Sequence, residues 1–241
     1  MAFQSVFKRY ELKYLLTKEQ KQKMLQAMQP YMQIDEYGRV TIRNLYFDTD
    51  DYLLIRRSME KPLYKEKLRL RSYAQVEENT PVYVELKKKF EDVVYKRRIA
   101  TSNDQALAWL CQGGRPPQDT QIAREIDYVL SFYGKPAPTV FLSYEREAYY
   151  CTDGSDFRVT FDEHILCRQE ALSLTEPAYG TPILPEDKVL MELKCSGGIP
   201  LWMVRHLSQE KIYKTSFSKY ATAYQKLIYS QQPILEDKIH A

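Results

Sequence analysis

The feature that most constrains the fold of this chain is a two-residue alternation of charged and apolar side chains, repeated in segment after segment. From Lys67 to Arg71, for example, every second residue is a cation and the residues between are leucines. Residues two apart on a β-strand share one face, so each segment predicts a strand with one charged and one apolar face. Eight segments have strand-like composition: 7–15, 40–48, 64–73, 82–90, 93–100, 139–150, 157–165 and 188–195.

Three other segments have the spacing of amphipathic helices. Thr17 and Gln20 form a capping box, which predicts that a helix begins there. Apolar residues also recur at helical spacing from Thr120 to Tyr133 and from Ser216 to Ile228. The stretches 113–119 and 170–186 are expected to be irregular. Each apolar helix stripe needs an apolar surface to cover.

The direction in which the charged strand faces point decides what the chain can do. An antiparallel sheet often has one solvated face, so the cations could point outward while the apolar faces fill a barrel. The helices would then have only a charged exterior to cover. If instead the charged faces point inward, the helices cover the outer apolar faces and the cations line a tunnel. We therefore expect an α+β fold, an eight-stranded antiparallel β-barrel with helices packed outside. We expect one domain over 1–241, with a barrel core at about 7–195 and helices at 199–231.

A tunnel lined by cations predicts an anionic ligand. Like charges in a confined space repel one another unless a polyanion is present, and arginine and lysine both suit phosphate oxygens. Arg146 shares a face with Leu142 and Tyr144, so the alternation alone does not assign it to the tunnel. Four carboxylates on charged faces could bind Mg²⁺ or Mn²⁺: Glu11, Glu85, Asp162 and Glu192. The alternation places these cations on charged faces: Arg9, Lys13, Lys67, Arg69, Arg71, Lys87, Lys96, Arg98, Arg158 and Lys194.

Composition and missing motifs exclude several other classes of protein. The 241 residues are 44% hydrophobic and 28% charged, with a net charge of +3, which is typical of a globular chain and indicates no partner. No run of 18 apolar residues and no signal-peptide core occur, so we expect a cytoplasmic protein without a membrane segment. The four cysteines form no Cys-x-x-Cys pair, and no Gly-x-x-x-x-Gly-Lys loop is present. Because most tyrosines lie on apolar faces, nucleic acid is not an expected partner.

Short motifs in a fixed order carry a resemblance to a known family. They are Arg-Tyr-Glu-Leu-Lys-Tyr at 9–14, Tyr-Phe-Asp-Thr at 46–49, Lys-Leu-Arg-Leu-Arg at 67–71, Glu-Leu-Lys at 85–87 and 192–194, Lys-Arg-Arg at 96–98, Tyr-Glu-Arg at 144–146 and Ser-Phe-Ser-Lys-Tyr at 216–220. Over roughly 7–228 the chain resembles the catalytic domain of vacuolar transporter chaperone (VTC) polyphosphate polymerases. That domain belongs to the triphosphate tunnel metalloenzyme, or CYTH-like, superfamily.

The resemblance implies roles for particular residues. Glu192 would hold a Mn²⁺ or Mg²⁺ ion, and Ser216, Ser218 and Lys219 would contact phosphate near one end of the tunnel. The residues expected to grip a triphosphate or a growing polyphosphate are Lys13, Arg69, Arg71, Lys87, Lys96, Arg146 and Arg158. We expect the most direct part in catalysis from Lys13, Arg69, Arg71, Lys87, Arg146 and Glu192.

One departure from the family pattern bears on the reaction. The superfamily's first-strand signature is Glu-x-Glu-x-Lys, and here Arg9 stands at its first position, before Glu11 and Lys13. This replacement favours a polymerase, which would transfer the γ-phosphoryl group of ATP to polyphosphate, over a hydrolase. A metal-dependent tripolyphosphate or nucleoside triphosphate hydrolase and a non-catalytic polyphosphate-binding module remain the alternatives. The expected ligands are ATP and polyphosphate, and a separate membrane protein is a partner that the sequence permits.

Overall fold

The computed structural model describes residues 10–91 and 93–229, which form one antiparallel sheet and six helices. The strands are β1 (Tyr10–Thr17), β2 (Met32–Asp48), β3 (Tyr64–Ser72), β4 (Val82–Phe90), β5 (Val93–Thr101), β6 (Ala137–Cys151), β7 (Arg158–Arg168), β8 (Thr181–Pro182), β9 (Lys188–Cys195) and β10 (Lys214–Thr215). The helices are α1 (Lys18–Met28), α2 (Leu53–Met59), α3 (Asn103–Gln112), α4 (Gln121–Phe132), α5 (Leu201–Gln209) and α6 (Lys219–Leu227). The strand order is β10-β1-β9-β7-β6-β2-β3-β4-β5, and β8 pairs with β7.

Local sequence signals set the ends of several elements. Thr17 and Gln20 form the expected capping box, with Gln20 N donating to Thr17 Oγ1 at 3.1 Å. Thr120 is the N-cap residue of α4, and its side chain accepts a hydrogen bond from Ala123 N. The last helix begins at Lys219, because Ser218 rather than Ser216 is its N-cap residue. All eight predicted long strands are present in the described residues, and β4 and β9 have the predicted bounds.

The sheet is strongly curled. Six inter-strand steps separate β1 from β4 in the strand order, which would amount to about 29 Å in a flat sheet. Yet Lys87 Nζ on β4 lies 2.6 Å from Glu11 Oε2 on β1. The charged face is therefore the inside of the curl, and we call it the inner face.

The expected α+β fold with one antiparallel sheet was confirmed, but a closed eight-stranded barrel was not confirmed for the described residues. The sheet has ten strands, and its order runs between two ends, β10 and β5. No described backbone ladder joins β1 to β5, so side chains such as Lys87 and Glu11 make the link across the gap. The two short strands β8 and β10, which the alternation did not predict, extend the sheet.

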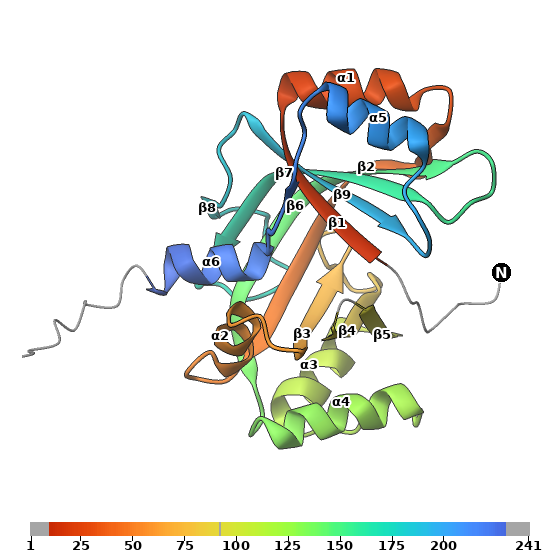
Figure 1. Ribbon diagram of the computed structural model, residues 1–241. Coiled ribbons are helices and arrows are strands. Elements are labelled where there is room, and N and C mark those ends of the chain that lie inside the picture. Colours follow the sequence, from red (N-terminus) through yellow and green to blue (C-terminus); the bar gives the residue numbers. More distant parts are fainter. Residues whose placement is uncertain (1–9, 92, 230–241) are drawn as a thin grey trace, which may run out of the picture.

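Two helical layers cover the outer face of the sheet, as the alternation predicts. Leu68, Leu70 and Leu86 pack in one apolar cluster with Trp109 of α3 and Ile126 of α4. A second cluster joins apolar residues of β1, β7 and β9 to α1 and α5. Figure 1 shows the two helix pairs at opposite ends of the molecule, with the sheet between them. The leucines therefore face helices, and the alternating cations face inward.

The last helix departs from the expectation that every helix packs outside. Tyr220 and Tyr224 of α6 pack in one cluster with Tyr46 and Leu142. Leu142 lies four residues before Arg146 on β6 and therefore shares its face. Helix α6 thus covers an apolar part of the inner face, and its N-terminus lies beside the charged part.

A β-bulge in β7 makes this arrangement possible. The pairing with β6 shifts between Ser143 and Glu145, and His164 of β7 has a φ of 46°. An extra residue reverses the alternation beyond it. Asp162 lies on the inner face before the bulge, and Ile165 and Cys167 pack under α6 after it.

None of the helices among the described residues is long and apolar enough to cross a membrane.

Candidate functional site

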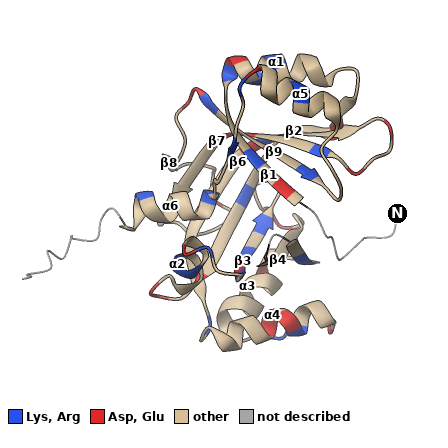
Figure 2. Cartoon of the chain, in the orientation of Figure 1, with Lys and Arg blue, Asp and Glu red and all other residues tan. Residues whose placement is uncertain are grey.

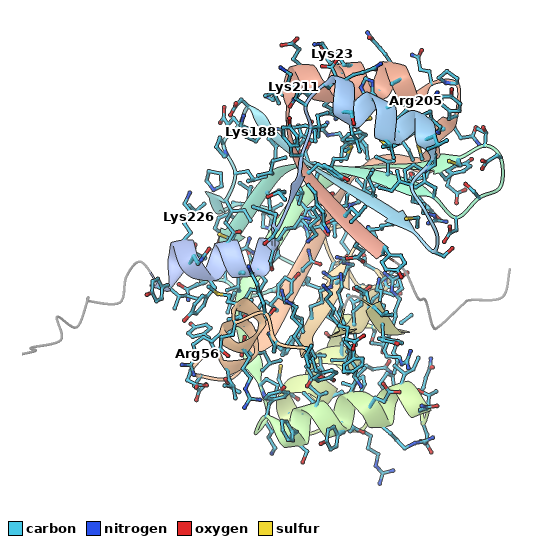
Figure 3. The ribbon with its side chains drawn as sticks, in the orientation of Figure 1. Lys23, Arg56, Lys188, Arg205, Lys211 and Lys226 are labelled. Atoms are coloured by element: carbon cyan, nitrogen blue, oxygen red, sulfur yellow. The ribbon has the colours of Figure 1, made fainter. Side chains whose placement is uncertain are left out.

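The inner face gathers cations from many strands, whereas other cations are ordinary surface residues. Figure 2 shows Lys and Arg on strands such as β1 and β3 as well as on the helices. Six cations at the periphery of the molecule are labelled in Figure 3, namely Lys23, Arg56, Lys188, Arg205, Lys211 and Lys226. The side chains of Lys23 and Arg56 are 45% and 46% exposed, in contrast to 6% for Arg71 of the inner face.

Glu85 of β4 is fully buried at the centre of a group that we call the Glu85 cluster. Arg69 donates to Glu85 Oε2 at 2.7 and 2.9 Å, and Arg98 Nε donates to Oε1 at 2.8 Å. Lys96 Nζ lies 2.7 Å from Oε1, and Arg71 Nε lies 3.8 Å from Oε2. One carboxylate therefore serves four cations and cannot neutralise them all.

The pKa values in the Glu85 cluster reflect this imbalance. Burial alone would raise the pKa of Glu85, but Arg71 and Arg69 hold it well below its usual range. Burial lowers the pKa of Lys96 to about 6, with a further contribution from Arg71, although Glu85 opposes the shift. Lys96 is thus the member that loses its proton most easily, and a bound anion would restore it.

A second group, the Asp162–Glu192 cluster, joins three strands to α6. Arg146 donates to both oxygens of Asp162, at 2.6 and 2.7 Å, and lies 3.4 Å from Glu192. Lys219 of α6 lies 2.5 Å from Asp162 Oδ2 and 3.2 Å from Glu192 Oε1. Lys194 Nζ lies 3.2 Å from Glu192 Oε2. Although burial alone would lower the pKa of Lys219, Asp162 and Glu192 raise it.

Three lysines lie near the N-terminus of α6, and we call them the lysine group: Lys13, Lys67 and Lys87. Lys87 pairs with Glu11, and Lys13 Nζ donates to Phe217 O at 2.6 Å and lies 3.8 Å from Glu192 Oε1. Lys67 Nζ donates to Ser218 Oγ at 2.9 Å and makes no ion pair with any described carboxylate. Burial, followed by repulsion from Lys13 and Lys87, lowers the pKa of Lys67 well below its usual range. Burial also lowers the pKa of Lys13 to about 8, although Glu192 opposes this. A half-buried set of like charges beside a helix N-terminus suits an anion.

The structure brings most of the predicted site residues together and leaves a few at the rim. Ser218 and Lys219 join the lysine group and the Asp162–Glu192 cluster, whereas Ser216 is exposed between β10 and α6. Arg158 is also exposed and lies opposite Lys194 in the β7–β9 register. Arg9 lies outside the described residues.

Arg146 lies on the inner face even though apolar residues share its side of β6. Its neighbour Tyr144 also faces inward, and its hydroxyl accepts a hydrogen bond from Arg71 Nη2 at 3.0 Å. Asn44 Oδ1 accepts from Arg71 Nε at 2.9 Å, and the Tyr46 hydroxyl accepts from Arg69 at 3.1 Å. Sequence reasoning missed these neutral partners, because only the charges on alternate positions were followed.

The four predicted metal ligands differ in what already occupies them. Glu85 and Asp162 are fully buried and ion-paired on both oxygens. Glu11 pairs with Lys87, which with Lys194 lowers its pKa to about 2 although burial opposes the shift. Glu192 is buried and is also ion-paired on both oxygens, with Lys13 and Lys219 on Oε1 and with Arg146 and Lys194 on Oε2. Residues 10–91 and 93–229 contain no group of three side chains suited to a metal. These donors fit a cation that one or two carboxylates share with phosphate oxygens, which is the usual manner of Mg²⁺.

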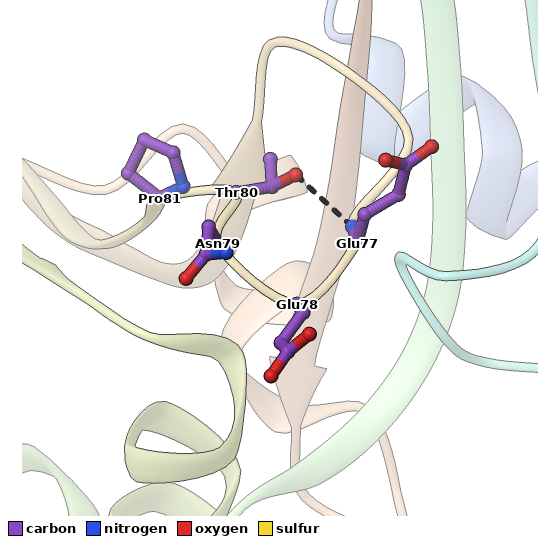
Figure 4. Close-up of a pocket in the computed structure, with 5 residues that line it drawn as sticks. All are labelled: Glu77, Glu78, Asn79, Thr80 and Pro81. Atoms are coloured by element: carbon purple, nitrogen blue, oxygen red, sulfur yellow. Dashed lines mark hydrogen bonds between the residues drawn. The ribbon is translucent and has the colours of Figure 1, made fainter.

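A hollow of about 530 Å³ on the β3–β4 loop does not belong to this site. Figure 4 shows its lining by Glu77, Glu78, Asn79, Thr80 and Pro81, with Glu77 N donating to Thr80 Oγ1 at 3.0 Å. Two carboxylates and no cation line it, so its chemistry does not suit phosphate.

The curled antiparallel sheet and its cationic inner face suit a protein that binds an anion. Comparisons with known proteins identify the family. Residues 8–228 match the model of the VTC domain, and the chain therefore belongs to the VTC domain family. No curated protein matches the chain.

Solved structures share the fold at low sequence identity. One is described as a "putative adenylate cyclase" of Bacillus halodurans, with 16% identity, a TM-score of 0.58, and coverage of 93% of this chain and 100% of the other. Another is described as a "putative adenylyl cyclase" of Hippeastrum with a dominant triphosphatase activity. It has 18% identity, a TM-score of 0.53, and coverage of 91% and 96%. These neighbours have the triphosphate tunnel, or CYTH-like, fold.

Proposed function

We propose that this protein is an ATP-dependent polyphosphate polymerase that transfers the γ-phosphoryl group of ATP to the end of a polyphosphate chain. The observation that carries this proposal is the lysine group, whose half-buried cations repel one another and in which Lys67 has no carboxylate partner among the described residues. A chain of phosphates supplies negative charge along the whole inner face. Membership of the VTC domain family supports the same ligand.

The inner face has the parts that phosphoryl transfer requires. This reaction depends mainly on alignment and on neutralisation of charge in the transition state. Arg69, Arg71 and Arg146 are fixed by the hydrogen bonds described above, so they can bind phosphate oxygens without further ordering. The lysine group and the N-terminus of α6 would bind the adjacent phosphates. No general base is required, because the attacking terminal phosphate is already an anion.

We further propose that Glu192, with Glu11 nearby, holds a Mn²⁺ or Mg²⁺ ion together with the phosphates. Such an ion would supply additional positive charge to the transferring phosphoryl group. The remaining carboxylates, Glu85 and Asp162, would act as counter-ions that position the arginines. In this proposal the curl of the long strands forms a tunnel wall around the bound chain.

Two alternatives predict different products from the same ligand. A hydrolase would release free phosphate, and the triphosphatase activity described for the Hippeastrum protein favours it as the second candidate. A non-catalytic polyphosphate-binding module would release nothing. Incubation of the purified chain with ATP and Mn²⁺ separates the three, because a polymerase gives ADP and polyphosphate together.

The control for this assay compares two arginines. Arg69→Ala removes a cation of the Glu85 cluster, and we expect it to abolish polymer formation. Arg56→Ala removes an exposed arginine of α2 that pairs with Asp51, and the activity should remain. Release of phosphate without polymer by the parent would contradict the proposed polymerase and support the hydrolase.

A further inference from the structure

Two tyrosines lie together at one end of the inner face. Tyr73 comes two residues after Arg71, and Tyr83 comes two residues before Glu85 on β4, so both share the parity of the charged residues. Their rings meet edge to face, with centroids 5.5 Å apart. Tyr73 is 39% exposed, and Tyr83 is half-buried. The pair therefore offers aromatic surface beside the cations.

Arg98 holds both rings in place. Its guanidinium carbon lies 4.5 Å from the centroid of the Tyr83 ring and 5.6 Å from that of Tyr73. Its Nη2 donates to the Tyr73 hydroxyl at 2.6 Å, and its Nε donates to Glu85 at 2.8 Å. The rings are thus fixed to the Glu85 cluster, so a ligand that stacks on them has little to order on binding.

The position of the pair fits one end of a nucleotide. Tyr83 is two residues from Glu85 and four from Lys87, which corresponds to about 7 and 13 Å along the strand. At the other end of the same two strands, the exposed Tyr64 and Phe90 have the parity of the outer face. The other inner-face tyrosines described above, Tyr46 and Tyr144, are buried.

We propose that Tyr73 and Tyr83 form the platform on which the base of the nucleoside triphosphate stacks. The triphosphate then runs from the Glu85 cluster toward the lysine group. This inference rests on the proposed function, since it names the subsite that distinguishes ATP from an inorganic polyphosphate. An aromatic face accepts any base, so the platform should prefer larger purines by stacking area rather than read one base by hydrogen bonds.

The test compares the affinity of two probes, ATP and inorganic tripolyphosphate, measured by titration calorimetry without divalent metal. Tyr73→Ala should weaken ATP binding roughly tenfold and leave tripolyphosphate binding as in the parent. Tyr73→Phe keeps the ring and removes the hydrogen bond to Arg98, so it should recover most of the lost ATP affinity. Tyr128→Ala, which removes a 65% exposed tyrosine of α4, is the matched control.

Three results would overturn the platform. Tyr73→Ala could leave ATP affinity as in the parent, weaken both probes equally, or be matched in its loss by Tyr73→Phe. The last two would show that Tyr73 acts only by positioning Arg98. A parent that binds neither probe refutes the proposed function itself, whereas a parent that binds both without an ATP-specific loss refutes only the platform. Tripolyphosphate affinity also reports whether each variant is folded.

Discussion

The sharpest consequence of the structure concerns Glu85, because one buried carboxylate serves four cations. Glu85→Gln keeps the size of the side chain and removes its charge. Breaking a buried ion pair by removing one partner costs about 3 to 5 kcal/mol. For a chain of this length, each kcal/mol lowers Tm by about 2 to 4 °C, so we expect the ligand-free variant to melt about 6 to 20 °C below the parent. Without Glu85, Lys96 loses its proton more easily, which relieves part of the repulsion. We therefore expect a drop in Tm toward the lower end of this range.

Thermal unfolding with and without inorganic tripolyphosphate measures both parts of this reasoning. The ligand supplies the negative charge that the variant lacks, so saturating tripolyphosphate should raise the Tm of Glu85→Gln more than that of the parent. The depressed pKa of Glu85 means that its contribution is present above the unfolded value of about 4.3 and declines as the pH falls below it. The Tm gap between parent and variant should therefore narrow in acid.

Glu66→Gln is the matched control for this experiment. Glu66 is a buried carboxylate on β3 that accepts a hydrogen bond from the Tyr64 hydroxyl at 2.8 Å, on the outer face of the sheet. Glu66→Gln should therefore gain no more Tm from saturating tripolyphosphate than the parent does. A Glu85→Gln protein as stable as the parent would refute the counter-ion role. Destabilisation that tripolyphosphate does not relieve would show that these cations are closed to phosphate.

Three further predictions follow from the other groups of the inner face. Lys67→Met should leave the ligand-free protein at least as stable by Tm, because like charges surround Lys67, and should weaken tripolyphosphate binding roughly tenfold or more by calorimetry. The lowered pKa values of Lys13 and Lys96 mean that ligand-free stability should rise with pH from about 6 toward 10, where the unfolded chain binds more protons. Binding of tripolyphosphate at pH 7.5 should then take up protons, and equal binding heats in buffers of different ionisation enthalpy would contradict this. Glu192→Gln should abolish polymer formation and reduce Mn²⁺ binding seen by electron paramagnetic resonance, while metal-free polyphosphate affinity holds or tightens. Polymer formation at the parent rate would remove Glu192 as the metal ligand.

The alternation of residues predicted the long strands and their facing because one physical rule governs both. Leu68 and Leu70 could not share a side with Arg69 and Arg71, and the helices needed the apolar side. The rule fails where the backbone departs from regular pleating. The bulge at His164 reverses the alternation of β7, and no feature of the local sequence predicts this bulge. Whether the sheet curls without closing depends on all of its strands together, so no local pattern in the sequence predicts it.

The candidate site was predictable in its membership but not in its partners. Charge and parity placed Arg69 and Arg146 on suitable strands, yet which carboxylate pairs with which cation depends on strands far apart in the chain. Arg146 meets Asp162 across a strand pair, and Lys219 reaches the same carboxylate from α6. The alternation also offered Glu85 as a metal ligand beside Glu192, which the resemblance singled out. Only the arrangement in space shows that four cations already surround each of these two carboxylates.

The carboxylates are unevenly distributed over the inner face, so its cations differ in how much negative charge lies beside them. Glu85 and the pair of Asp162 and Glu192 hold their neighbouring arginines in fixed positions, and these arginines remain charged whether or not a ligand is bound. Lys67, by contrast, has a lowered pKa and a single hydrogen bond to Ser218, so its charge depends on the ligand. Phosphate therefore gains most where compensation is least, beside the N-terminus of α6. A protein built in this way gives up stability in the ligand-free state, and the binding of a polyanion returns it.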